Sequence, residues 1–178
     1  LLAWPTTNVQ SVPTAGNTEV RETELKVADL KFDPKLQTRA KPHDVKYIMT
    51  LVGVIKEGTL QAPIVVFRDP TDGGMWLADG HARVEAAKSA GGAMIRARVY
   101  EGGLREAFMF ALGANATHGA RRTNADLRHA VLAALADSEM GNWSNVQIAQ
   151  VCLCSDTFVG IVRKKLAPAS GKPATRRK

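Results

Sequence analysis

The chain has 178 residues, of which 45% are hydrophobic, so it is long enough to bury a core of ordinary size. No apolar run approaches the roughly 18 residues that a membrane span needs, so membrane insertion is not expected. The 24 Lys and Arg against 17 Asp and Glu give a net charge of +7, which favours an anionic partner, with nucleic acid ahead of a membrane surface.

The positive charge is concentrated at one end of the chain. From Gly119 onward there are ten Lys and Arg against four Asp and Glu, so this third holds +6 of the net +7. A nearly neutral body with a basic end is typical of a phosphate-contacting module joined to another unit. The alternative at this point is a basic protein whose charge serves only solubility.

The two cysteines, Cys152 and Cys154, are too close for an ordinary disulfide and too few for a zinc site. They fall inside a helical pattern, where cysteine packs as a small apolar residue, and we prefer this role to a redox one. The N-terminus lacks a basic leader followed by a long apolar stretch, so we expect a cytoplasmic protein.

The first half of the chain alternates between strand and helix patterns. A short strand is predicted at 24–30, a helix at 44–55 and a buried strand at 63–67. Turn-forming residues at 69–74 then lead into a strand at 75–78, which predicts a hairpin.

The same alternation continues with a helix at 82–90, a strand at 93–100 and a helix at 104–114. A polar, glycine-containing stretch follows at 115–123, and we interpret it as a functional loop. The fold class predicted for residues 21–118 is therefore α+β, with a small mixed sheet and helices.

The rest of the chain has a helical pattern. A helix capped by Thr123 or Asn124 is predicted to run to about Ser138, and Ser144-x-x-Gln147 fits a capping box that opens a short helix at 145–151. Residues 152–154 form a tight turn before the last helix, which is predicted at 156–166 with Phe158, Ile161 and Val162 turned inward. A short helix, a three-residue turn and a second helix predict a helix-turn-helix domain at 119–167.

The predicted helix-turn-helix supplies candidate DNA contacts. The first turn of its last helix, with Ser155 and Thr157, would face base edges, while Arg163, Lys164 and Lys165 would face phosphates. The alternative is a plain helical bundle whose basic face is only solvated. Outside these domains, residues 1–20 predict a flexible arm and residues 168–178 a basic tail.

Two polar segments interrupt the apolar pattern. Asp79, Gly80 and His81 lie between a strand end and a helix start, where free N–H groups and the helix dipole favour an anion such as phosphate. Arg83, one turn further, could hold a pair of phosphate oxygens.

The second polar segment lies before another helix start and supplies an amide, a hydroxyl, a histidine and two guanidinium groups. These candidate ligands are Asn115, Thr117, His118, Arg121 and Arg122. A turn between a strand and a helix is usually only a turn, but the two segments together favour a phosphate site.

At these residues the chain resembles the ParB/sulfiredoxin superfamily. Five features occur in the family's order: Gln37-Thr38-Arg39 after the first strand, the apolar strand Pro63–Val66, the box Gly80-His81-Ala82-Arg83, an Asn-centred motif near Asn115, and a helix-turn-helix. The sequences of the two polar motifs are similar to those of a ParB-like subgroup common on plasmids and phages. The whole chain also resembles plasmid proteins of the fertility-inhibition class, which suppress DNA transfer by conjugation or type IV secretion machinery.

This resemblance implies a bacterial, cytoplasmic protein that binds DNA and binds and hydrolyses a nucleoside triphosphate, ATP or CTP, with Mg²⁺ or another divalent cation. It adds Gln37 and Arg39 to the nucleotide site, and some members are nucleases. Sulfiredoxin chemistry is not expected, because that chemistry needs a cysteine at the position of His81. His81 also replaces a glutamate of the ParB box, and Ala114 stands where ParB usually has glutamate.

The motifs and the resemblance leave three candidate functions. The first is a ParB-like nucleoside triphosphatase with metal-dependent DNase activity, which inhibits conjugative or type IV secretion transfer through components of that machinery. Its candidate catalytic residues are His81, Arg83, Glu85 and His118, with Asp79 and Glu85 as metal ligands. The second is a non-enzymatic DNA-binding partition or transcription regulator with a relic nucleotide pocket. The third is an inhibitor that acts only through protein contacts.

Overall fold

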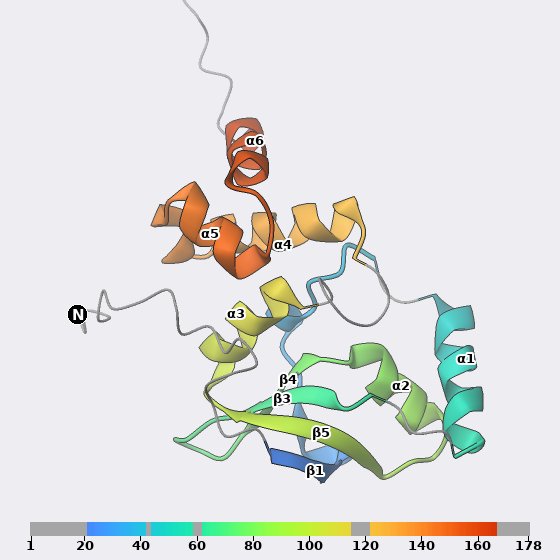
Figure 1. The fold of residues 1–178 in the computed structure, drawn as a ribbon. Helices are drawn as coiled ribbons and strands as arrows, with labels where there is room; N and C mark the ends of the chain where they lie inside the picture. Colours follow the sequence, from blue (N-terminus) through green and yellow to red (C-terminus); the bar gives the residue numbers. More distant parts are fainter. Residues whose placement is uncertain (1–20, 42–43, 59–61, 115–121, 167–178) are drawn as a thin grey trace, which may run out of the picture.

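The computed structural model describes residues 21–41, 44–58, 62–114 and 122–166. Figure 1 shows a sheet with two helices at one side of it and a group of helices packed above the other. The described part contains a five-stranded mixed sheet, so the α+β fold class with a helical C-terminal part is confirmed.

The strand order in the sheet is β1-β5-β3-β4-β2. β5 lies antiparallel to β1 and parallel to β3, while β4 lies antiparallel to β3 and parallel to β2. The strands span Arg21–Lys26 (β1), Leu30–Lys31 (β2), Ile64–Arg68 (β3), Met75–Asp79 (β4) and Met94–Glu101 (β5). The predicted hairpin is present as β3 and β4.

The single strand predicted at 24–30 is wrong, because a 3₁₀ turn at Val27–Asp29 divides it into β1 and β2. The turn lets Val27 and Leu30 both enter the core. β1 and β2 are the two edges of the sheet, yet only residues 27–29 lie between them. The four Cα–Cα steps from Lys26 to Leu30 can span only about 14 Å. Four strand spacings of a flat sheet measure about 19 Å. The sheet must therefore curl so that its edges approach each other.

Two helices cover one face of the sheet, α2 (His81–Ser89) directly and α1 (Val45–Lys56) outside it. Both were predicted within about two residues of these bounds. The core beneath α2 consists of the buried side chains of Val27, Leu30, Ile64, Val66, Leu77, Val84, Ala87 and Ala97.

The opposite face of the sheet packs against α3 (Leu104–Gly113) and, beyond it, the C-terminal helices. These are α4 (Asn124–Ala136), α5 (Asn145–Cys152) and α6 (Asp156–Leu166), with 3₁₀ turns at Pro34–Leu36 and Met140–Asn142. One apolar core runs from Phe67 and Tyr100 in the sheet through Phe108 in α3 to Ile148 and Val159 in the helical part. The predicted boundary at residues 118 and 119 stays a prediction, and this core lies on both sides of it.

The inward face of α6 differs from the prediction. Val159 and Val162 are buried and Phe158 is half-buried, but Ile161 is 48% exposed. At about 100° per residue, Ile161 lies about 200° around the helix from Val159, so the two cannot face the same core. The placement of Ile161 inside was wrong, and Val159 takes that place.

Leu153 ends α5 in the left-handed conformation, with φ 49° and ψ 57°. Its N–H and that of Cys154 close the helix by donating to carbonyls of the last turn of α5. A left-handed residue is typical at this position, but it is usually Gly or Asn rather than a branched side chain.

Leu153→Ile is therefore expected to lower the free energy of unfolding by about 1–2 kcal/mol, because β-branching penalises the left-handed region. Leu153→Asn should leave stability equal or slightly higher. Urea denaturation of the two variants measures the difference. Equal midpoints for Ile and Asn would show that the backbone at Leu153 carries no strain.

Candidate functional site

The start of α2 follows β4 directly, and Gly80 makes the turn between them. Gly80 has φ 101°, a left-handed value that favours glycine, and a Cβ built on it would lie 2.6 Å from Cγ2 of the fully buried Ile64. No side chain caps the first turn of α2. The N–H groups and the positive end of the helix dipole at this point are suited to an anion.

Arg83 lies over this turn. Its Nη2 donates to Oδ2 of Asp79 at 2.9 Å, and its Nη1 donates to the carbonyl of Ala62 at 3.2 Å. A Cβ on Gly80 would also lie 3.0 Å from Arg83 Nη2, so the guanidinium group is next to the helix start. An anion bound there would compete with Asp79 for Arg83.

His81 and Glu85 are four residues apart in α2, so they share one side of the helix, away from Arg83. His81 makes an edge contact with the ring of Phe32, with centroids 6.4 Å apart, and Lys88 Nζ lies 4.6 Å from the same ring. Glu85 is exposed. His81 thus contacts Phe32, whereas Arg83 contacts Asp79 and Ala62, so these contacts of the two candidate catalytic residues lead to different segments.

The predicted metal ligands do not fit a protein-held cation. Asp79 is paired with Arg83, and its side chain is only 26% exposed. In the part of the chain that the structure describes, no group of three or more His, Cys, Asp or Glu side chains is arranged to hold a metal ion. We derive no reaction step through a metal at this site.

Gln37 and Arg39 lie near the start of α4 and the end of α3. Thr38 Oγ1 donates to the carbonyl of Ala111 at 3.0 Å, and Arg39 Nη1 lies 3.7 Å from Oδ2 of Asp126. Gln37 ends the 3₁₀ turn before this segment, where its N–H donates to Pro34. The segment containing Gln37 and Arg39 therefore joins the elements that flank the second polar loop.

Asp126 anchors this junction, and the sequence analysis did not single it out. Its carboxylate accepts from the N–H groups of Ala40 and Thr123 and from the Thr123 hydroxyl, at 2.8–3.0 Å. Burial raises the pKa of this carboxyl, but the hydrogen bonds outweigh it and hold the pKa below the ordinary value. The spacing Thr123-x-x-Asp126 is a capping box, and that signal could have found it.

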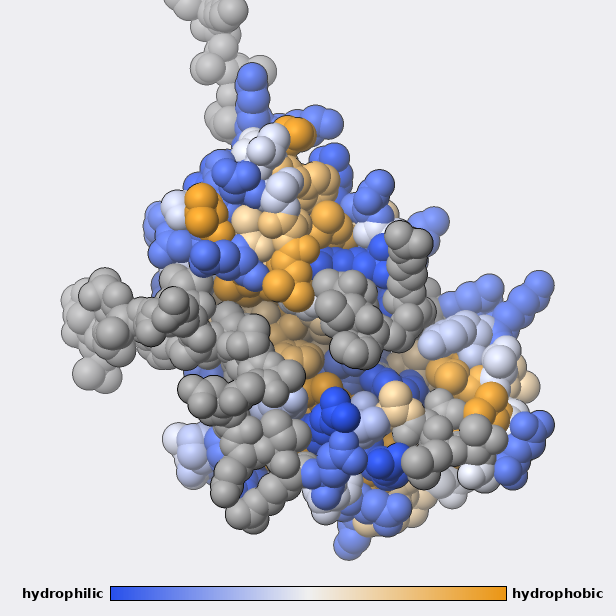
Figure 2. Space-filling model, viewed as in Figure 1, coloured by the Kyte–Doolittle hydropathy of each residue, from blue (hydrophilic) through white to orange (hydrophobic). Residues whose placement is uncertain are grey.

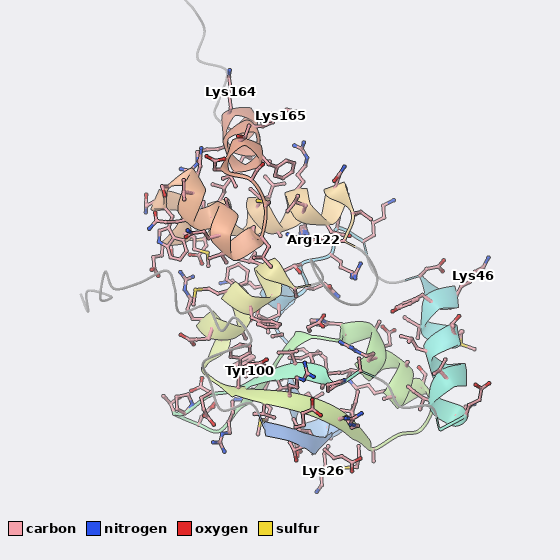
Figure 3. The ribbon with its side chains drawn as sticks, viewed as in Figure 1. Lys26, Lys46, Tyr100, Arg122, Lys164 and Lys165 are labelled. Carbon is pink, nitrogen blue, oxygen red and sulfur yellow. The ribbon has the colours of Figure 1, made fainter. Side chains whose placement is uncertain are left out.

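Arg122 does not point into an anion site. Its Nη1 donates to the carbonyl of Cys152 at 2.7 Å and its Nη2 to the carbonyl of Leu112 at 3.1 Å. Burial lowers the pKa of this guanidinium. It lies between the ends of α3 and α5 and connects them (Figure 3), and its role in nucleotide binding stays a prediction. Asn115, Thr117, His118 and Arg121 lie outside the described residues.

The helix-turn-helix prediction concerns α5 and α6. Ser144 and Gln147 form the predicted capping box, with hydrogen bonds of 2.9 Å and 3.3 Å. Three residues separate α5 from α6, and the axes are bent by 113°, within the range typical of this motif. No single described helix is long and apolar enough to cross a membrane, although this bent pair passes the same test when taken together.

The candidate DNA-contacting residues divide into two groups. Ser155 Oγ accepts from the N–H of Phe158, and Thr157 is exposed on the first turn of α6. Lys164 and Lys165 are exposed at the far end of α6 (Figure 3). Arg163 is different, because its guanidinium donates to the carbonyls of Gly141 and Trp143, at 3.3 Å and 2.6 Å. Arg163 thus makes contacts within the helical part, and its phosphate contact stays a prediction.

The cysteines pack as predicted. Cys152 is buried in the large apolar core, and burial raises the pKa of its thiol to about 12. Burial also raises the pKa of the half-buried Cys154. Both thiols are free, and neither is activated as a nucleophile at neutral pH.

No protein-family model matches this chain. A Streptomyces griseus protein described as "Streptomycin biosynthesis operon possible regulatory protein" is 30% identical over 150 residues. That match covers 81% of this chain, which spans only 40% of the length of that relative.

Solved ParB domains share the fold. The pNOB8-like ParB N-domain superposes with a TM-score of 0.58 at 13% identity, over 80% of this chain and 67% of that one. ParB from Caulobacter crescentus, complexed to the centromeric parS site, superposes with a TM-score of 0.54 at 20% identity, over 83% of this chain and 73% of that one. The Caulobacter protein has also been solved with CTP-γ-S. The ParB part of the predicted resemblance is confirmed at the level of the fold.

Proposed function

From the premise that this chain has the fold of a ParB N-terminal domain, we propose that it binds DNA through α5 and α6 and a nucleoside triphosphate at the start of α2. The observation that carries the proposal is the helix-turn-helix geometry, with two exposed lysines at the end of α6. The Caulobacter relative of the same fold is complexed with DNA, which supports this choice.

The nucleotide part of the proposal rests on the turn between β4 and α2. Gly80 makes the tight turn between β4 and α2, the first turn of α2 has no side-chain cap, and Arg83 lies beside it. These features fit the phosphates of a nucleotide. CTP is the first nucleotide to test, because the Caulobacter protein has been solved with CTP-γ-S, and ATP is the second. Hydrolysis is a further proposal, for which His81, Arg83 and Glu85 are the candidates among the described residues.

Lys164→Ala combined with Lys165→Ala is expected to weaken DNA binding similarly for all sequences. Each lost phosphate contact should flatten the plot of log K against log salt by about 0.9, or about 1.8 for both. Fluorescence anisotropy over a salt series measures this slope. The matched control is Lys46→Ala with Lys56→Ala on α1, which lies away from α6 (Figure 3). An unchanged slope in the α6 variant would remove α6 from the DNA interface.

Arg83→Ala is expected to weaken CTP and ATP binding about tenfold to a hundredfold, because a charge-assisted hydrogen bond to phosphate is lost. Isothermal titration measures this affinity. The control is Arg68→Ala, which removes an ion-paired arginine at the other end of β3. Equal nucleotide affinity in wild type and Arg83→Ala would exclude the proposed site.

A second candidate is a DNA-binding regulator without enzymatic activity. The Streptomyces relative is described as a possible regulatory protein, which supports a regulatory role. Release of inorganic phosphate from CTP and ATP separates the two. Release by the wild type that exceeds release by Arg83→Ala supports the enzyme. Equal background from both proteins, with DNA binding intact, supports the regulator.

A further inference from the structure

The solvent face of α6 forms one continuous stripe. Thr157, Gly160, Ile161 and Lys164 follow one another at spacings of three, one and three residues, which places them on one side of a helix. Thr157, Ile161 and Lys164 are exposed, while Val162 is buried on the other side. Ile161 is therefore an exposed apolar side chain between Thr157 and Lys164 on this stripe.

A polar group lies beside the stripe near Ile161. A Cβ on Gly160 would lie 3.1 Å from Nδ2 of Asn145, so the amide of the first residue of α5 lies next to the stripe. Figure 2 shows apolar side chains at the surface of the helical part, bordered by hydrophilic ones. Ile161 lies on the solvent side of α6, the second helix of the helix-turn-helix, which enters the major groove of DNA in proteins with this motif.

Charge decides between a second copy of this chain and nucleic acid as the occupant. Lys164 and Lys165 are both exposed at the end of the stripe. A symmetric contact between two copies of this face would bring these lysines toward their own counterparts, which is unfavourable. DNA would place phosphates beside the lysines and base edges beside the middle of α6.

We propose that Ile161 is a specificity-determining residue that contacts the C5 methyl group of thymine in the major groove. This proposal rests on the proposed DNA binding through α6. Thymine alone carries a methyl group on this edge, so an apolar side chain can distinguish it from cytosine. The Asn145 amide can pair with the adenine edge, which makes an A·T-containing site the expected target.

The test replaces thymine with uracil, which removes only the C5 methyl group. Short duplexes are first enriched from a random pool on the wild-type chain, and the best sequence is then made with dT or with dU. The wild type should bind the dU duplex about fourfold more weakly for each contacted methyl group. Ile161→Ala should bind both duplexes equally, at the wild-type affinity for the dU duplex.

Ile161 is 48% exposed, so its truncation should leave the fold intact, which circular dichroism and urea denaturation check. The matched control is Met49→Ala on α1, which truncates a 61% exposed apolar side chain away from α6 and should keep the wild-type preference for dT.

Four results overturn the proposal. Equal wild-type affinity for the dT and dU duplexes, or an unchanged dT preference in Ile161→Ala, excludes methyl recognition by Ile161 while salt-dependent DNA binding persists. A change in oligomeric state on Ile161→Ala, seen by sedimentation, assigns the stripe to a protein contact. Absence of salt-dependent DNA binding by the wild type instead overturns the proposed function itself, and this proposal with it.

Discussion

Gly80→Ala is expected to lower the free energy of unfolding by about 2–4 kcal/mol, the largest stability loss that we predict for one added methyl group. The φ of Gly80 is 101°, where an L-residue is strained, and its new Cβ would lie 2.6 Å from Cγ2 of Ile64. Ile64 is fully buried in the middle of the sheet core, so it has no free space to move into. Urea denaturation measures the change.

Gly91→Ala is the matched control. Gly91 follows α2 with a φ of 77°, but no atom lies within 4 Å of a Cβ built there. This variant therefore carries the backbone strain without the clash, and we expect a loss of about 1 kcal/mol. If Gly80→Ala cost no more than Gly91→Ala, Ile64 would have to move easily, and the close packing behind the turn would be disproved.

Gly80→Ala also separates the effect on folding from the effect on nucleotide binding. At temperatures where Gly80→Ala is still folded, its affinity for CTP and ATP should fall below detection, because the added methyl group shifts the backbone N–H groups that the phosphates need. Gly91→Ala should bind as the wild type does. Isothermal titration of both variants measures this. Full affinity in folded Gly80→Ala would place the nucleotide elsewhere.

Arg122→Met is expected to lower the free energy of unfolding by about 2–3 kcal/mol. The guanidinium donates to the carbonyls of Leu112 and Cys152, which belong to the last turns of α3 and α5. Those carbonyls carry the negative ends of two helix dipoles, which the positive charge stabilises. Methionine keeps much of the apolar stem but satisfies neither carbonyl.

The control for Arg122 is Arg128→Met on α4. Arg128 is half-buried, and within the described ranges the structure shows no hydrogen bond or ion pair for it, so we expect a change within about 0.5 kcal/mol. Thermal denaturation and nucleotide titration of both variants distinguish the two roles of Arg122. Unchanged stability with lost nucleotide affinity would support the nucleotide role predicted from the sequence.

Local signals in the sequence predict most helices well. The bounds predicted for α6 agree with the structure because Ser155 offers a cap at one end and the helical pattern ends before Pro168. The capping box at Ser144 and Gln147 forms as expected, since its two hydrogen bonds join residues only three apart. Such signals depend on neighbouring residues alone.

The sequence could not assign the partners of the arginines. Arg122 and Arg163 resemble phosphate ligands in a basic segment, but each donates to backbone carbonyls 10 to 30 residues away in the chain. Every residue offers a carbonyl, so no residue type marks these acceptors. The two arginines therefore stabilise the helical part, and the cations that face solvent on α6 are Lys164 and Lys165.

The site at Gly80 was predictable in part. A glycine between a strand and a helix is visible in the sequence, and the structure places Gly80 at this turn with a left-handed backbone. That Ile64 blocks any larger residue depends on how β3 and β4 pair, including a register shift between Val65 and Val66. A pairing register of this kind cannot be derived from the two strand sequences alone.

The core that passes through α3 limits how this chain can be recombined. Phe108 and Leu112 of α3 pack in the same cluster as Ile148 and Val159 of the helical part. A cut near residue 118 would leave both fragments with apolar surface that the other normally covers. α5 and α6 are thus not an interchangeable unit, and grafting them onto another protein would require α3 to be transferred with them.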